Sequence, residues 1–374
     1  MGSSITVKPV RGRRERKAFA ECGRLVHPPS SRFIAPLDSD VVDYVTESKN
    51  PFFAEAHIEH FIAWRDDDPV GRIAAVIEQR YVDHFGPTGW FGWFDCINDT
   101  EVAGALLGTV EGWLRDRGMA RVEGPYSYDA TQEFGLLVEG FGHEPALMQP
   151  HHEPYYQDLL RQSGYRKRFG TSTYSWTLGD PGLEAVSERG RRALDGSDMT
   201  VRSPSLKQGS KDLESLWELF VATFSNQHDM LPMTREVFDW QLQSMKFFLD
   251  EKLVRVVEKD GQAIAFSFLA ADANEVLKVA QGRMTPLTLA RLPMLLRRVT
   301  GTVVLMIGVR AGFEATGAGR VIAGQIADVA LGKVGRYSAV HTTWIHDDNR
   351  DSHALVNRTG AKPRRRYEVV GKDL

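Results

Sequence analysis

One segment near the C-terminal end limits the possible folds of this chain most. Residues 303–309 are nearly continuous in Val, Leu, Ile and Met, which is typical of a strand buried on both faces. Gly317-Ala318-Gly319 follows in a loop, and Ile322, Ile326 and Val329 then share one face of a helix. This succession points several backbone N–H groups and the positive end of a helix dipole at one spot. Because glycines let the backbone approach an anion closely, the pattern predicts a phosphate or pyrophosphate site.

A Walker A loop, a dinucleotide fingerprint and a simple tight turn are the alternatives to a pyrophosphate site at these glycines. A Walker A loop needs Gly-Lys-Ser/Thr, whereas Arg320 and Val321 follow Gly319 here, so we exclude it. A dinucleotide fingerprint needs G-x-G-x-x-G early in a βαβ unit, whereas the next glycine is Gly324 and the segment follows a hairpin. A loop that only makes a tight turn stays open as an alternative.

The two halves of the chain follow the same order of elements. Each half predicts a hairpin, a strand, a helix, a further strand, a helix that ends at glycine, and a last strand. The hairpin and the strand after it lie at 56–77 and 90–96 in the first half, and at 254–269 and 303–309 in the second. We therefore predict a duplicated α/β chain with a domain at 1–178, a Gly-, Ser- and charge-rich linker at 179–204, and a second domain at 205–374.

Two motifs in the second half resemble a known family. Residues 308–320 resemble the acyl-CoA pyrophosphate loop of the GNAT acyltransferases, which usually reads Arg/Gln-x-x-Gly-x-Gly/Ala directly after the fourth strand. Residues 344–349, with Gly360 eleven residues later, resemble that family's next element, a strand end with Asn followed by a helix beside the CoA arm. The whole chain also resembles bacterial tandem GNAT-like proteins, through residues 140–141, 153–156 and 282–286.

The resemblance implies a fold, a donor and a set of site residues. The fold is α/β, with two tandem GNAT-like domains, each a mixed, mostly antiparallel sheet flanked by helices. The donor is acyl-CoA, acetyl-CoA or longer, held between two central strands while a backbone N–H near Val309 polarises the thioester carbonyl. The residues implied to bind it are Val309, Arg310, Gly317, Ala318, Gly319 and Arg320. The candidates for catalysis are His346, Asp347 and Asn349, with a solvated loop histidine as the alternative for His346.

Several positions depart from the family pattern. Glu314 replaces the usual leading Arg or Gln, and Val356 stands where the family often has a tyrosine that protonates the leaving thiolate. The strand at 90–96 enters its helix without a glycine pair, so we expect a degenerate N-terminal copy that supports the fold and lines the substrate pocket. The candidate pocket residues are Glu133, His152 and Tyr155, with His151 beside them. The basic cluster at 362–366 is expected to meet the CoA 3′-phosphate or to form a solvated strand edge.

Composition excludes several classes of protein. The net charge of −3 gives no global attraction to nucleic acid or anionic membranes, so we expect no DNA and no membrane partner. Cys22 and Cys96 are the two cysteines and lack metal-ligand spacing, so we expect no metal and a reducing cytoplasm. The acceptor is expected to be the amine of a small molecule or an amino acid derivative. A donor on an acyl carrier protein or aminoacyl-tRNA, and a non-catalytic binding protein of the same fold, remain alternatives.

Overall fold

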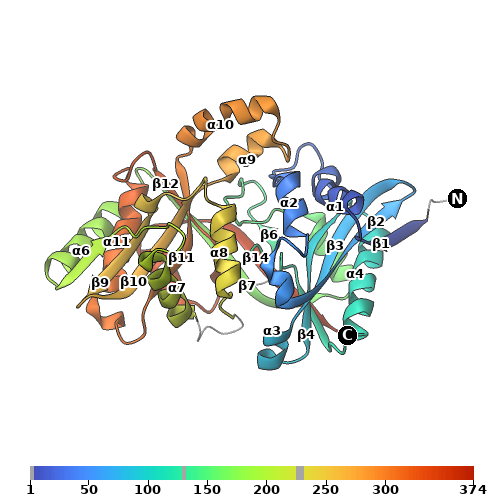
Figure 1. The fold of residues 1–374 in the computed structure, drawn as a ribbon, viewed down its shortest axis with the longest axis horizontal. Helices are drawn as coiled ribbons and strands as arrows, with labels where there is room; N and C mark the ends of the chain where they lie inside the picture. Colours follow the sequence, from blue (N-terminus) through green and yellow to red (C-terminus); the bar gives the residue numbers. More distant parts are fainter. Residues whose placement is uncertain (1–3, 129–131, 225–230) are drawn as a thin grey trace. The chain divides into compact units, whose positions relative to one another are not determined.

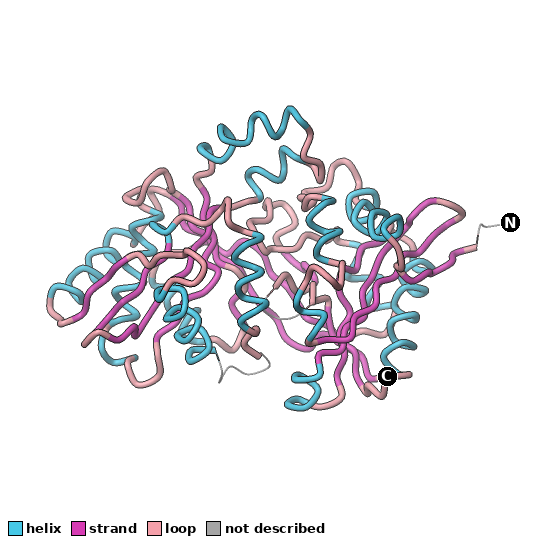
Figure 2. Tube along the Cα trace, in the orientation of Figure 1, coloured by secondary structure: helices cyan, strands magenta, loops and turns pink. Residues whose placement is uncertain are grey.

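The computed structural model describes residues 4–128, 132–224 and 231–374, and Figures 1 and 2 show the course of the chain. These residues divide between two compact units, neither of which is one continuous stretch of sequence. Unit 1 comprises Met1–Thr171, Leu277–Ala290 and Arg365–Leu374, and unit 2 comprises Ser172–Val276 and Arg291–Arg364. The boundaries cut through single strands and helices, so neighbouring segments of the chain contribute to different units.

The sheet of unit 1 is mostly antiparallel. Its strands are β1 (Ile5–Pro9), β2 (Ala56–Arg65), β3 (Asp68–Glu78), β4 (Thr88–Cys96), β5 (Arg121–Gly124), β6 (Leu136–Glu139) and the end of β14 (Lys362–Asp373). Neighbouring strands follow the order β1-β2-β3-β4-β5-β14, and β4 and β5 run parallel. The long β2–β3 hairpin predicted from alternating residues is present, with Ile62 opposite Arg72.

Among the described residues, five α-helices lie wholly within unit 1. They are α1 (Arg13–Val26), α2 (Asp38–Tyr44), α3 (Gln79–Phe85), α4 (Thr100–Arg115) and α5 (Tyr155–Gln162). The apolar face of α4, which includes Leu106 and Val110, packs on the sheet in one core with Phe91 and Tyr156. Burial of side chains this large stabilises the fold by about 1.5–3 kcal/mol each, so this core holds α4 and α5 against the strands.

The sheet of unit 2 repeats the plan of unit 1. Its strands are β8 (Met199–Arg202), β9 (Val254–Lys259), β10 (Gln262–Ala271), β11 (Gly301–Val309), β12 (Ala339–Thr342), the end of β7 (Arg166–Thr177) and β13 (Ile345–His346), which pairs with β7. As β4 and β5 do in unit 1, β11 and β12 run parallel within an otherwise antiparallel sheet. The predicted buried strand is β11, in which residues 301–304 are buried.

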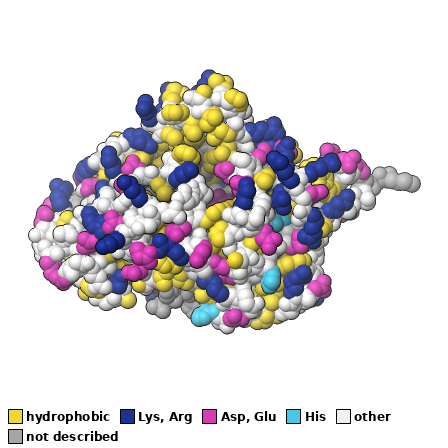
Figure 3. Space-filling model, in the orientation of Figure 1, with side chains coloured by type: hydrophobic (Ala, Val, Ile, Leu, Met, Phe, Trp, Pro, Cys, Tyr) yellow, Lys and Arg dark blue, Asp and Glu magenta, His cyan; other side chains and the backbone are white. Residues whose placement is uncertain are grey.

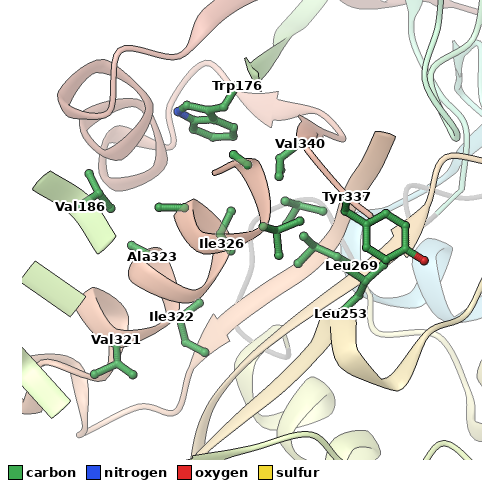
Figure 4. Close-up of a cluster of buried hydrophobic side chains, with 14 of the residues drawn as sticks. Trp176, Val186, Leu253, Leu269, Val321, Ile322, Ala323, Ile326, Tyr337 and Val340 are labelled. Atoms are coloured by element: carbon green, nitrogen blue, oxygen red, sulfur yellow. The ribbon is translucent and has the colours of Figure 1, made fainter. Parts of the chain in front are cut away.

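Further helices belong wholly or in part to unit 2. They are α6 (Leu183–Asp195), α7 (Lys211–Phe224), α8 (Arg235–Ser244), α11 (Ala318–Ala330) and α12 (Arg350–Arg358); α9 (Asn274–Ala280) and α10 (Pro286–Arg298) run across the boundary between the units. Figure 4 shows the core under α11, where Ile322 and Ile326 meet Leu269 of β10 and Val340 of β12. This core holds the start of α11 at the end of β11.

The α/β architecture predicted from the sequence, with mixed and mostly antiparallel strand pairing flanked by helices, is confirmed, and the strands form one continuous ladder. Residues 179–204, expected to be a linker, contain α6 and β8, which belong to unit 2. The last strand, expected to complete the second domain, pairs with β5 and β6 of unit 1 instead. No helix among the described residues is long and apolar enough to cross a membrane.

Candidate functional site

The candidate site lies where two parallel strands of unit 2 stop pairing. The pairing of β11 with β12 ends at Val304 and Thr342. Beyond that point β11 continues along β10 to Val309, after a register shift between Met306 and Val304. The chain after β12 instead forms β13, which pairs with β7, the neighbour of β12 on the side away from β11. Residues 305–309 of β11 are therefore not paired with β12. A molecule held between two central strands requires such a separation of the strands.

The backbone N–H of Val309 faces the edge of β11 that is not paired with β12. Arg310 N donates to the carbonyl oxygen of Ile264 in β10 at 2.7 Å. Because N–H groups alternate between the two edges of a strand, the N–H of Val309 points away from β10. A donor at this position can polarise a carbonyl group lying alongside β11. The predicted role of Val309 is thus compatible with the backbone geometry.

The predicted glycine loop ends at the start of α11. Gly317 is the N-cap residue, with a φ of 90° that favours glycine, and it has no side chain to satisfy the first N–H groups of the helix. Thr316 Oγ1 accepts from Ala318 N at 3.3 Å. A Cβ at Gly319 would lie 3.7 Å from Val309 Cγ2, so the first turn of α11 lies against the end of β11. The loop and this edge of β11 therefore form one continuous surface.

Charged side chains surround this loop in a definite arrangement. The carboxylate of Glu314, the departure from the family pattern, turns back and accepts from Gly312 N at 2.9 Å. Arg320 folds over the N-terminus of its own helix, where a Cβ on Gly317 would come within 3.0 Å of its Nη2. Glu314 is thus held by its own loop, and Arg320 offers positive charge at the helix N-terminus, where an anion is also favoured by the dipole.

The three predicted catalytic residues lie at the end of β13 and the start of α12. His346 Nδ1 accepts from Asp348 N at 3.1 Å, and its side chain is 37% exposed. Asp347 is exposed. Asn349 is the N-cap of α12, and its Oδ1 accepts from Ser352 N at 3.0 Å. Of the three, Asn349 has a structural role that explains its position, while His346 and Asp347 remain candidates.

A tyrosine–histidine pair, not predicted from the sequence, lies beside these residues. Val356, at the position of the family's tyrosine, is 2% exposed and packs in the core. One helical turn earlier, His353 Nδ1 lies 3.2 Å from the hydroxyl of Tyr174 in β7. Tyr174 N in turn donates to Thr342 Oγ1, at the last residue of β12, at 3.0 Å. Helical spacing from Asn349 could have indicated His353, but nothing local in the sequence points to Tyr174.

The corresponding place in unit 1 differs in ways that remove an anion site. The N-cap of α4 is Asp99, whose carboxylate accepts from Glu101 N and Val102 N at 2.8 and 3.3 Å. A second oxygen of the same carboxylate accepts from Arg65 at 2.6 Å. Its helix N-terminus is therefore already satisfied by a carboxylate from within the chain. This supports the prediction of a degenerate N-terminal copy.

The strand separation is also absent from this place in unit 1. A Cβ at Gly92 of β4 would lie only 1.4 Å from the carbonyl oxygen of Tyr126, so the two backbones are in direct contact. Tyr126 N donates to Phe91 O at 2.9 Å, which extends the pairing of β4 beyond β5. Glycine is required here for close packing of backbone on backbone. No ligand can lie between β4 and this segment.

The predicted pocket residues lie in unit 1 and differ in exposure. Glu133 is exposed, and its backbone carbonyl accepts from Ser127 N at 2.7 Å. His152 is 6% exposed and accepts from Leu137 N through Nδ1 at 3.2 Å; burial lowers its pKa to about 3. Tyr155 donates its hydroxyl to Cys96 O at 2.8 Å. His152 and Tyr155 thus have structural partners, and their role in a pocket stays a prediction.

The members of the basic cluster at 362–366 have different surroundings, and at least one of them is neither at a solvated edge nor available to an anion. Arg365 is 2% exposed and donates to the carbonyl oxygens of Pro150 and His143. Lys362 pairs with Asp180 at 2.6 Å. The prediction for Arg365 is therefore wrong, because buried carbonyl groups of its own unit take up its guanidinium. Within the parts of the chain that the structure describes, no group of three His, Cys, Asp or Glu residues could hold a metal ion.

The fold defined by these two units is that of the tandem GNAT proteins. The chain superimposes with a TM-score of 0.59 on a tandem GNAT protein from the clavulanic acid biosynthesis pathway, at 10% identity, covering 99% of this chain and 98% of that one. It matches a GCN5-related N-acetyltransferase from Sphaerobacter thermophilus with a TM-score of 0.53 and 14% identity, covering 99% and 95%. The predicted fold class is confirmed, and this fold supports N-acyl transfer in general.

Two curated proteins are similar along nearly the whole chain. Protein YghO of Escherichia coli K12 is 27% identical over 369 residues, which cover 96% of this chain and 93% of that protein. The bacterial ceramide synthase of Caulobacter vibrioides is 26% identical over 385 residues, covering 100% and 98%. No family model matches the chain. Both similarities extend over the two units.

Proposed function

We propose that this protein is an N-acyltransferase that moves an acyl group from acyl-CoA to an amine. The observation that carries the proposal is the contrast between two helix N-termini. Asp99 occupies the N-terminus of α4 with its own carboxylate, whereas the N-cap of α11 is Gly317, which has no side chain, and the neutral hydroxyl of Thr316 accepts from Ala318 N. The N-terminus of α11 adjoins the edge of β11 that β12 has left. A pyrophosphate bound at this helix N-terminus would lie next to the edge of β11. The thioester arm attached to it could then run along that edge and reach the N–H of Val309, which points away from β10.

Each part of the site has a role in this proposal. The backbone of residues 317–320 and the guanidinium of Arg320 hold the pyrophosphate. The N–H of Val309 stabilises negative charge that develops on the thioester oxygen as the amine attacks. The pair of Tyr174 and His353 exchanges the proton, in place of the tyrosine that Val356 replaces. His346 and Asp347 remain candidates for a base that deprotonates the amine.

For the acceptor, we propose an amine attached to a long apolar chain. The support is the name of the Caulobacter relative, a ceramide synthase, since a ceramide carries an acyl group on the nitrogen of a long-chain amino alcohol. A screen of amines with short and long chains would separate this acceptor from small polar amines and amino acid derivatives.

Calorimetric titration with acetyl-CoA and CoA tests the donor site directly. We expect the wild-type protein to bind both ligands, and Gly317→Glu with Gly319→Glu to abolish binding, because two carboxylates would lie where the pyrophosphate does. No binding by the wild-type protein at millimolar ligand would rule out acyl-CoA as donor. A carrier-protein donor, an aminoacyl-tRNA donor or a non-catalytic role would then replace it.

Two matched variants separate charge from folding. In Gly319→Ala the new Cβ meets only an ordinary contact, 3.7 Å from Val309 Cγ2, so binding should remain within a few-fold of wild type. In Gly104→Glu with Gly108→Glu, two glycines of α4 with open space around them receive the same two negative charges, and binding should not change. Loss of binding in this control would show that net charge, and not the loop, controls affinity.

A further inference from the structure

Exposed apolar side chains are concentrated on α10, on the end of α9 and on the turn between these two helices. Among the described residues, the large hydrophobic side chains with high exposure include five between 279 and 294: Val279 (48%), Met284 (37%), Leu287 (59%), Leu289 (58%) and Met294 (42%). Figure 3 shows the corresponding apolar surface over α10. Single exposed apolar residues are common, but a contiguous patch marks an interaction surface.

Arginines accompany these apolar residues without acidic partners. Arg291, Arg297 and Arg298 are exposed, and none of the described residues forms an ion pair with them. The sequence has no Asp or Glu between Glu275 and Glu314. The whole chain carries a net charge of −3, so this local positive charge stands apart from the average. A surface with negative charge would therefore be attracted to α10 and not to the protein as a whole.

Helical geometry places the apolar and basic side chains together on the outer face of α10. Leu287, Arg291, Met294 and Arg298 follow one another at spacings of four, three and four residues, so they share a face. On the opposite face, Leu292, Leu295 and Leu296 are partly buried against the core of unit 2. The helix is therefore held by one side and presents the other, apolar with a basic border, to its surroundings.

We propose that α10 docks on the surface of a bilayer that contains anionic phospholipids. The helix would lie in the plane of the interface, with Leu287 and Met294 among the outer acyl groups and the arginines at the phosphates. A second copy of the chain is a less suitable occupant, because a two-fold contact through α10 would bring arginines against arginines. The expectation of no membrane partner rests on the net charge of the whole chain. The present proposal rests on the local cluster of arginines on α10.

Vesicle flotation tests the proposal without reference to catalysis. The purified protein is mixed with two kinds of vesicles. One kind is pure phosphatidylcholine, and in the other about a third of the lipid is phosphatidylglycerol. We expect the protein to float with the anionic vesicles and to remain below with the neutral ones. Each arginine near the surface contributes roughly fivefold to partitioning, so Arg291→Gln, Arg297→Gln and Arg298→Gln together should lower it about a hundredfold. Leu287→Ser with Met294→Ser should also lower it, by about tenfold or more.

A matched control and a second measurement make the outcome decisive. Phe247→Ser removes an apolar side chain that is 63% exposed elsewhere in unit 2, and partitioning should not change. Circular dichroism of each variant checks that the fold is retained. Equal flotation of the wild-type protein and the arginine variant, or no flotation with anionic vesicles, would overturn the proposal. A dimer in light scattering that Leu287→Ser with Met294→Ser dissociates would assign the surface to a second copy instead.

Discussion

The hydroxyl of Tyr174 lies 3.2 Å from Nδ1 of His353, and Nε2 of the same imidazole lies 3.1 Å from the carbonyl oxygen of His346. A carbonyl oxygen only accepts, so Nε2 carries the hydrogen and Nδ1 accepts from the Tyr174 hydroxyl. The backbone of β13 thereby sets the tautomer that allows the hydroxyl and the imidazole to exchange a proton.

Replacing the tyrosine hydroxyl should reduce the rate of acyl transfer without weakening donor binding. We expect Tyr174→Phe and His353→Gln each to lower kcat about a hundredfold, the scale of general acid–base catalysis, while the Kd for acetyl-CoA stays within a few-fold of wild type. The measurement is steady-state kinetics with the best amine acceptor, together with the pH profile of kcat. Since the two residues act as one pair, the double variant should be no slower than the slower single one.

Tyr337→Phe is the control for this pair. It also removes a hydroxyl from unit 2, one that donates to Asp250 Oδ2 at 3.1 Å, and kcat should be unchanged. A kcat of Tyr174→Phe equal to that of wild type would remove the pair from the mechanism and leave His346 and Asp347 as the candidates for proton transfer.

The closest contact between two helices of unit 2 predicts a large effect of a single methyl group. A Cβ at Gly324 of α11 would lie 2.8 Å from the Cα of Gly190 in α6, so the two backbones touch. We expect Gly324→Ala to lower the free energy of unfolding by about 1–3 kcal/mol, because the helices must move apart. Gly108→Ala on α4 meets open space and should raise stability by up to about 1 kcal/mol. Urea unfolding of both variants provides the comparison, and an unchanged midpoint for Gly324→Ala would contradict this packing.

The same contact explains why residues 179–204, predicted to be a linker, lack the apolar density that is typical of a core helix. Leu183, Val186 and Gly190 lie on one buried face of α6, but a glycine in the contact replaces the large apolar residue that would have marked a core helix. The strand, loop and helix from 301 to 330 could be predicted because each depends on local periodicity and on glycine at the turn. Local pattern carries no information about partners, so the pairing of Tyr174 with His353, 179 residues apart, could not be predicted.

The pairing of the last strand, β14, likewise could not be predicted from local sequence pattern. Alternation within residues 366–370 predicts a strand, but the register of Val370 opposite Gly124 depends on which sheet edge remains open after the rest of the chain has folded. The error for Arg365 has the same origin, because a run of basic residues is typical of a solvated edge and only the tertiary fold buries one member of it.

A buried ion pair in unit 1 should be sensitive to removal of one partner. Arg72, 3% exposed, donates through Nε to Asp95 Oδ2 at 2.8 Å. Burial raises the pKa of Asp95, but Arg72 and His27 outweigh this effect and hold the pKa well below its usual range. We expect Arg72→Met to lower the free energy of unfolding by about 3–5 kcal/mol, because a buried carboxylate loses its partner.

Urea unfolding measures this loss, and an exposed pair supplies the control. Arg161 contacts Asp158 at 2.6 Å with both side chains more than half exposed, so Arg161→Met should cost less than about 1 kcal/mol. Adding Asp95→Leu to Arg72→Met should recover part of the lost stability, since no unpaired charge then remains. Equal losses for Arg72→Met and Arg161→Met would mean that the buried pair is not intact in solution.

A buried histidine of unit 1 predicts how stability depends on pH. His60, 5% exposed, lies 2.7 Å from the Tyr128 hydroxyl, and burial, with a smaller effect of Arg72, lowers its pKa to about 3. The unfolded chain takes up this proton near pH 6.5 and the folded one does not, so the contribution of His60 is complete above pH 6.5 and is lost as the pH falls toward 3. The expected slope is up to about 1.4 kcal/mol per pH unit in this range, and His60→Gln, which cannot titrate, should reduce it by that amount. Urea unfolding at several values between pH 7 and pH 4.5 measures both slopes; parallel curves for the two proteins would mean that His60 is protonated equally in the folded and unfolded states.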